Sequence, residues 1–218
     1  MRHRLAALAC IALAACSGEP QPTPSPTPSA TPTPDKPKTL VPADLAALTL
    51  GAKIVGPRGP DVDSTFSADG QKLAEVTSYV ACPEGTSECK PDAMPEGTVY
   101  TYVHQVTPAD GVMSGTLFRT ARAARGFAND VGYDQAQATK ALGPDGRIDV
   151  SVDNGALVWR VIGGDGWKAG EPIIFYWQST VPPAGPRDAY QFEADGATAL
   201  GTGPFPPKQE PVDGAAAR

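Results

Sequence analysis

The chain has 218 residues and a formal net charge of −6, with a sequence pI of about 4.9. A surface of that sign repels phosphate backbones, so general nucleic-acid binding is not expected. No stretch approaches the roughly 20 consecutive apolar residues of a transmembrane helix, which excludes an integral helical bundle. The hydrophobic content of 41% is sufficient for a packed core, and the length suits one domain with appendages.

The N-terminal segment has the three parts of a bacterial export signal. Residues 2–4 are Arg-His-Arg, residues 5–12 are apolar, and residues 13–16 read Leu-Ala-Ala-Cys. The apolar stretch is too short to span a bilayer but long enough for the core of a signal peptide. In this segment the chain resembles bacterial lipoproteins, whose lipobox is Leu, two small residues and Cys.

This resemblance implies that residues 1–15 are a cleaved signal peptide and that Cys16 becomes the lipidated first residue. Two or three acyl chains would then hold the protein durably on a membrane. Ser17 follows the cysteine, and in Gram-negative lipoproteins this favours the outer membrane, with the protein facing the periplasm. The alternative is an ordinary secretory signal with a chance cysteine.

A proline-rich segment follows the cysteine. Residues 19–38 contain 8 prolines in near-alternation with Thr and Ser, and they have no large apolar side chain. Such a composition favours polyproline II and cannot form a core, so residues 16–38 are predicted to be a disordered linker that spaces the domain from the membrane. A Pro-x-x-Pro ligand or an O-glycosylated stretch are the alternatives.

Residues 39–207 are predicted to form one mainly β domain. The clearest unit is a hairpin in which Asn154-Gly155 turns the chain between residues 147–153 and 156–162. A two-residue turn would pair apolar with apolar and acid with base: Val152 with Leu157, Val150 with Trp159, and Asp149 with Arg160. A Tyr-rich strand before this hairpin resembles the immunoglobulin-like modules of bacterial surface proteins, which implies a β-sandwich and no particular function.

Other elements follow from short apolar runs between turn residues. Strands are expected at residues 73–82, 98–107, 116–120, 171–180, 188–193 and 198–201. Because residues 173–177 are apolar without interruption, that strand should be central and covered on both faces. One short helix is expected over residues 135–142, capped by Asp134 and ended by Gly143-Pro144. The chain after Gly203 should fray, with residues 208–218 a flexible tail.

The four cysteines are predicted to differ in what becomes of them in the mature protein. Cys10 leaves with the signal peptide, and Cys16 carries the lipid. Cys82 and Cys89 remain in the domain, with six residues between them, and are predicted to form a disulfide in an oxidising compartment. A zinc site is less favoured because its usual cysteine spacing is two to four residues, and a redox pair would read Cys-x-x-Cys.

A search for catalytic and cofactor motifs finds little. His104, the single histidine beyond the signal peptide, lies in a strand pattern and is predicted to be a packed or edge residue. No nucleophile elbow, Walker A loop or dinucleotide fingerprint occurs, so no cofactor is expected. The acidic stretch at residues 61–66 fails as an EF-hand because Phe66 stands where Gly is required, so no metal is expected either.

Trp167 is the candidate ligand-binding residue. It lies in a Gly-rich segment, where an exposed indole could stack on a sugar ring. The alternative is that it folds back as a lid on the end of the sandwich. Arg119, Arg122 and Arg125 form a small basic cluster that could meet an anionic partner, although solvated charges are the ordinary interpretation.

These features predict a lipid-anchored envelope protein with a non-catalytic binding or envelope-organising domain. Its expected partners are the membrane, through Cys16, and an envelope glycan or protein. One alternative is a carbohydrate- or peptidoglycan-binding module that uses Trp167. Another is a carboxylate-dependent hydrolase, since 22 acidic residues follow residue 38 and glycoside hydrolysis requires only two suitably spaced carboxylates.

Overall fold

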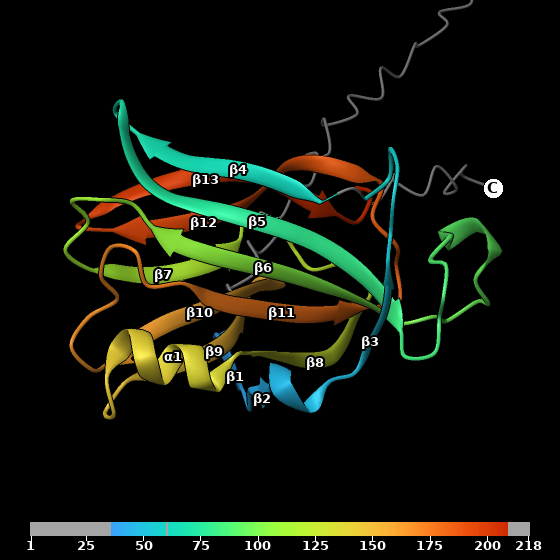
Figure 1. Cartoon of the computed structure of the whole chain (residues 1–218), viewed down its shortest axis with the longest axis horizontal. Coiled ribbons are helices and arrows are strands. Elements are labelled where there is room, and N and C mark those ends of the chain that lie inside the picture. The colour runs from blue at the N-terminus through green and yellow to red at the C-terminus, as the bar shows by residue number, and fades with distance from the viewer. Residues whose placement is uncertain (1–35, 60, 209–218) are drawn as a thin grey trace, which may run out of the picture. The chain divides into compact units, whose positions relative to one another are not determined.

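The computed structural model describes residues 36–59 and 61–208 (Figure 1). The predicted signal peptide, Cys16 and most of the linker lie outside the described residues, as does the chain from residue 209. The described strands are β1 (Lys38–Leu40), β2 (Ala43–Asp44), β3 (Leu50–Lys53), β4 (Val62–Ala68), β5 (Gln71–Pro83), β6 (Tyr100–Pro108), β7 (Gly115–Thr120), β8 (Phe127–Tyr133), β9 (Arg147–Asp153), β10 (Ala156–Gly163), β11 (Ile173–Ser179), β12 (Gly185–Ala194) and β13 (Ala197–Phe205). The helices are α1 (Gln135–Leu142) and two 3-10 turns, η1 (Leu45–Ala47) and η2 (Pro91–Ala93).

The strands form two sheets, which confirms a mainly β fold. The six-stranded sheet has the order β1-β9-β10-β7-β12-β13. The seven-stranded sheet has the order β2-β8-β11-β6-β5-β3, with β4 also paired to β5, and it curls into a half-barrel (Figure 1). All strand pairs are antiparallel except β2 with β8. These sheets are larger than the three- and four-stranded sheets of an immunoglobulin constant domain.

The predicted hairpin of β9 and β10 has the expected register. Val152 pairs with Leu157, Val150 with Trp159, and Asp149 with Arg160. Asn154 and Gly155 have φ of 49° and 79°, as a type I′ turn requires. The alternation of apolar residues and the turn chemistry therefore specify the same pairing.

Aromatic side chains fill the space between the two sheets. Phe118 on β7 packs 5.1 Å from Phe175 on β11 and 5.7 Å from Tyr190 on β12, measured between ring centroids. The Trp159 indole on β10 donates a hydrogen bond across the interior to the Gly132 carbonyl on β8, at 3.0 Å. Each large buried ring removes apolar area from water, and the one polar atom of Trp159 retains a partner.

Strand β11 lies in the middle of its sheet, as its uninterrupted apolar run predicted. It pairs with β6 along residues 173–179 and with β8 on its other edge. Helix α1 forms where expected: the Asp134 carboxylate accepts from the backbone N–H of Gln137 at 2.9 Å, and Gly143 ends the helix with φ of 82°. The helix contacts β9 and β11, one strand from each sheet.

The prediction of fraying after Gly203 is wrong. Strand β13 continues through Phe205, which is buried and pairs with Gly185 at the start of β12. Pro204 is tolerated because β13 is an edge strand of its sheet, where a missing N–H donor costs little. Among the described residues there is no helix of the length and hydrophobicity needed to cross a membrane.

Candidate functional site

Trp167 is buried, which agrees with the interpretation that it folds back over the end of the domain and contradicts the hypothesis of an exposed, ligand-binding indole. Its relative exposure is 0%, and its Nε1–H donates to the Glu171 carbonyl at 2.6 Å. The ring packs edge-on against Phe192 and Phe175, with centroids 5.3 and 5.6 Å away. The residue therefore closes one end of the space between the sheets, and its ring presents no face to a sugar.

A glycine on the neighbouring strand allows this closure. The Gly115 N–H bonds to the Trp167 carbonyl at 2.7 Å, at the first residue of β7. A Cβ placed on Gly115 would lie 2.9 Å from the Phe192 ring and 3.1 Å from the Trp167 ring. The close approach of backbone and indole is therefore available only to glycine at this position.

The disulfide between Cys82 and Cys89 is confirmed. Cys82 lies near the end of β5, and the Cα atoms of the two cysteines are 5.6 Å apart. Cys89 also forms an isolated bridge with Ile54, so the covalent link holds the segment after β3 against the end of β5. Both cysteines are buried.

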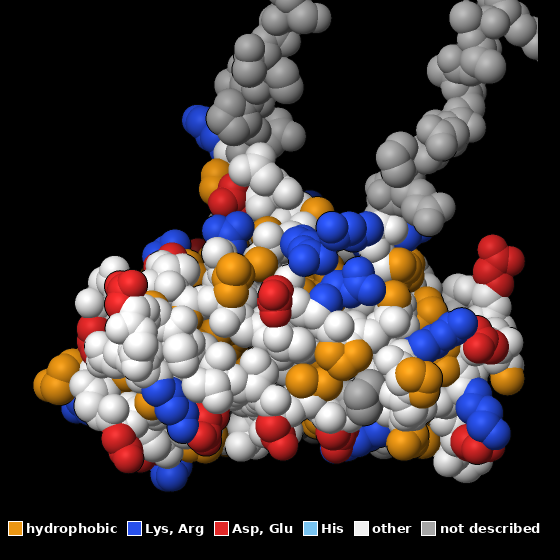
Figure 2. Space-filling model, turned by 90° about the horizontal axis from the view of Figure 1, so that it is seen from above, with side chains coloured by type: hydrophobic (Ala, Val, Ile, Leu, Met, Phe, Trp, Pro, Cys, Tyr) orange, Lys and Arg blue, Asp and Glu red, His pale blue; other side chains and the backbone are white. Residues whose placement is uncertain are grey.

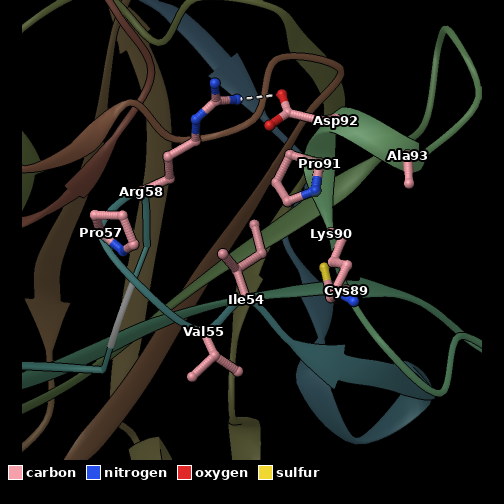
Figure 3. Close-up of a pocket in the computed structure, with 9 residues that line it drawn as sticks. All are labelled: Ile54, Val55, Pro57, Arg58, Cys89, Lys90, Pro91, Asp92 and Ala93. Carbon is pink, nitrogen blue, oxygen red and sulfur yellow. Dashed lines mark hydrogen bonds and ion pairs between the residues drawn. The ribbon is translucent and has the colours of Figure 1, made fainter.

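A cleft of about 370 Å³ lies beside this disulfide (Figure 3). One wall comes from the segment after β3 and the other from the segment that runs from Cys89 into η2, with these lining residues: Ile54, Val55, Pro57, Arg58, Cys89, Lys90, Pro91, Asp92 and Ala93. At the top of the view, Arg58 donates to Asp92 at 2.6 Å. The cleft is therefore mainly aliphatic, with a charged pair at its rim.

The chemistry of this cleft suits binding of an apolar group. Val55 is 86% exposed although it is aliphatic, whereas Ile54 beside it is buried and supports the wall. The Arg58–Asp92 pair is exposed to solvent, so it contributes at most about 1 kcal/mol to stability and remains open to a polar partner. Sequence reasoning did not find this cleft because its two walls are more than 30 residues apart in the chain.

His104 is enclosed in the core, as expected of a packed residue. Its Nδ1 lies 2.9 Å from the Ser78 hydroxyl, and its ring centroid is 4.2 Å from that of Tyr190. Burial lowers the pKa of His104 to about 3, so the ring is neutral near pH 7. His104 and Ser78 are a base and a hydroxyl in contact, but both have 0% exposure and no substrate can reach them in this conformation.

Among the described residues, the structure gives little support to a metal site or to a catalytic pair of carboxylates. Over residues 36–59 and 61–208, no group of three or more potential ligands is placed to hold a metal ion. Asp63 and Glu75 line a shallow hollow on the β4–β5 hairpin. There Asp63 accepts from the Thr77 hydroxyl at 2.7 Å, and Glu75 is paired with Lys72. Both carboxylates thus already have partners within the hairpin.

Removing the disulfide should destabilise the domain. The Cys82→Ala/Cys89→Ala variant is expected to lose about 2–3 kcal/mol of unfolding free energy, because the unfolded chain regains the freedom that the short loop restricts. Urea denaturation at neutral pH measures this loss. Adding a thiol reductant should lower the stability of the wild type toward that of the variant and leave the variant unchanged. A wild-type stability that is the same with reduced cysteines would contradict a stabilising link.

No family model, curated protein or solved structure was found to match this chain.

Proposed function

We propose that this protein is a lipid-anchored component of the bacterial cell envelope whose β-rich domain binds or organises other envelope components without catalysis. The observation that carries the proposal is the lipobox at residues 13–16, in register with a basic start and an apolar stretch. Acyl chains on Cys16 would hold the protein on the membrane, with each buried methylene contributing about 0.8 kcal/mol. Ser17 favours the outer membrane, with the domain facing the periplasm.

Two features of the domain support a binding role. The cleft beside the disulfide exposes Val55 next to an ion pair that a partner can reach. His104, which a Ser-His-acid triad would have to use, is enclosed between the sheets. A domain held on a proline-rich spacer is suited to reach such a partner at some distance from the membrane.

For the architecture, we propose a sandwich-type arrangement that resembles immunoglobulin-like modules of bacterial surface proteins only at the level of two packed sheets. The contacts of Phe118 with Phe175, and of His104 with Tyr190, join side chains from opposite sheets and support this arrangement. Such a resemblance carries no function with it.

The two alternatives have less support. A glycan-binding module was expected to use Trp167, and the burial of that ring removes the surface on which a sugar would stack. A carboxylate-dependent hydrolase would need two carboxyl groups facing a substrate. Asp63 and Glu75 share a hollow, but each already interacts with a neighbour on the same hairpin.

The anchor is tested by replacing the cysteine of the lipobox. In cells supplied with a labelled fatty acid, Cys16→Ala should abolish label incorporation and move the protein from the membrane fraction to the soluble fraction. Cys10→Ala is the matched control, because it removes a thiol from the same segment and should retain both the label and the membrane association. Label retained by Cys16→Ala, or lost equally from Cys10→Ala, would refute the assignment of the lipid to Cys16.

A further inference from the structure

The described chain enters and leaves the domain at the same end of the six-stranded sheet. Strand β1 begins there, with Lys38 paired to Val152 at the end of β9. Strand β13 ends there, with Phe205 paired to Gly185 at the start of β12. The segment after β7 lies at this end too, since the Ala124 N–H bonds to the Gly155 carbonyl in the β9–β10 turn at 2.8 Å. We call this end the linker end.

Cations gather at the linker end although the domain as a whole is acidic. These are Lys36 and Lys38 at the β1 edge of the sheet, and Arg122, Arg125 and Lys208 in the segments after β7 and β13. Figure 2 shows Lys and Arg side chains grouped in the upper middle of one face of the molecule. The ion pairs between described residues involve none of these five cations, whereas Arg119 from the sequence cluster lies 3.9 Å from Asp153.

Three of these cations line a hollow of about 570 Å³. Arg122, Arg125 and Lys208 surround it, and the Arg125 guanidinium donates to the Lys208 carbonyl at 3.4 Å. The other lining residues are small or apolar: Ala123, Gly126, Phe205, Pro206 and Pro207. Guanidinium groups match the geometry of phosphate oxygens, and the apolar floor suits the glycerol and upper acyl carbons next to a phosphate. We call this hollow the basic pocket.

The basic pocket lies at the end of the domain to which the linker from Cys16 is attached. In the sequence, 19 residues separate Cys16 from Lys36, and as polyproline II, at about 3.1 Å per residue, they would span roughly 60 Å. With Cys16 anchored as proposed, the linker joins the domain at this end, so this end can reach the membrane surface. An acidic domain is repelled by anionic lipid overall, so a local group of cations would orient it with this end toward the surface.

We propose that the basic pocket docks the linker end of the domain onto anionic phospholipid, with Arg122 and Arg125 contacting the lipid phosphate. The inference rests on the proposed lipid anchor for its biological setting. Its test uses a chain without the lipidated cysteine, so the docking site and the anchor can fail separately. Each cation near an anionic surface contributes roughly a fivefold gain in affinity, which falls as salt is added.

The experiment measures binding of residues 17–218 to vesicles of phosphatidylcholine alone or with phosphatidylglycerol, by co-sedimentation at low salt. The wild type should bind the vesicles that contain phosphatidylglycerol. Arg122→Glu/Arg125→Glu should weaken that binding by at least tenfold, because it removes two attractive charges and adds two repulsive ones. The matched control is Arg147→Glu/Lys168→Glu. These exposed cations lie at the opposite end of the same sheet, at the start of β9 and next to the start of β7, and this variant has the same net charge.

Three results would overturn the proposal. One is equal loss of binding in both charge-reversal variants, which would indicate a net-charge effect without a site. Another is equal binding to vesicles with and without phosphatidylglycerol. The third is that vesicle binding appears only when the chain is truncated after Lys208. That result would indicate that the chain's own acidic residues Glu210 and Asp213 occupy the basic pocket in the longer chain. Circular dichroism of each variant confirms that the comparison is between folded proteins.

Discussion

Acidification from about pH 7 to about pH 4 is expected to lower the unfolding free energy by about 3 kcal/mol through His104 alone. The imidazole has 0% exposure, and burial lowers its pKa from 6.5 to about 3. Phe118, Tyr190 and Ser78 surround the ring, and no carboxylate among the described residues hydrogen-bonds to it. Its Nε2 has no hydrogen-bond partner among them either, so a second proton would be buried without compensation.

The sign follows from the proton balance. Below pH 6.5 the unfolded chain takes up a proton at this histidine, whereas the folded protein does so only near pH 3. The unfolded state therefore binds more protons throughout this window, and stability falls as the pH falls. The contribution is complete above pH 6.5, and below about pH 3 no further loss arises from this group.

The variant His104→Asn isolates this contribution, because the amide can approach the Ser78 hydroxyl from the Nδ1 position but does not titrate. It should be less stable at pH 7, since the ring leaves a cavity, yet its unfolding free energy should depend less on pH between about 3 and 6.5. Denaturant unfolding across this range measures the difference in slope, and the carboxylates common to both proteins cancel. Equal slopes in the wild type and the variant would show that His104 is accessible to protons in the folded state.

Turn chemistry explains which strands could be predicted. The hairpin at Asn154-Gly155 has both a two-residue turn and alternating apolar residues, and the three residue pairs predicted for it are confirmed. Asp69-Gly70 joins β4 to β5 with φ of 51° and 80°, which is the same kind of turn. Strand β4 was nevertheless missed, because Phe66 is its one buried side chain and the acidic residues around it suggested a loop.

The other missed strands depend on contacts distant in sequence. Strand β8 contains Asn129 with φ of 63° and a Gly132 whose Cβ would lie 1.9 Å from the Ala43 carbonyl oxygen. Strand β8 therefore has no alternation of apolar and polar residues with a period of two, and it forms because β2 and β11 pair with it. The cleft beside the disulfide and the basic pocket are likewise built by segments far apart in the chain, and only the cysteines and the arginine cluster marked their positions in the sequence.

Trp167→Ala is expected to destabilise the domain by about 3–5 kcal/mol, with a cavity left between Phe192 and Phe175. The ring of Trp167 closes the interior, and its N–H satisfies the Glu171 carbonyl, so truncation loses both packing and a hydrogen bond. Trp167→Phe should retain most of the packing and cost less. Met113→Ala nearby is the control for an exposed apolar side chain, since Met113 is 75% exposed and its truncation should change stability by no more than about 0.5 kcal/mol.

The same three variants separate a closing role from a glycan-binding role for Trp167. If Trp167 closes the interior, its truncation lowers the unfolding free energy, which thermal or urea unfolding measures. Trp167→Phe should then bind peptidoglycan to the same extent as the wild type. A stacking residue would behave in the opposite way, with stability near that of the wild type after Trp167→Ala and with lower glycan retention. Because the ring is enclosed by two aromatic neighbours, opening it to a sugar would first require the end of the domain to unpack, and that requirement makes the closing role the stronger expectation.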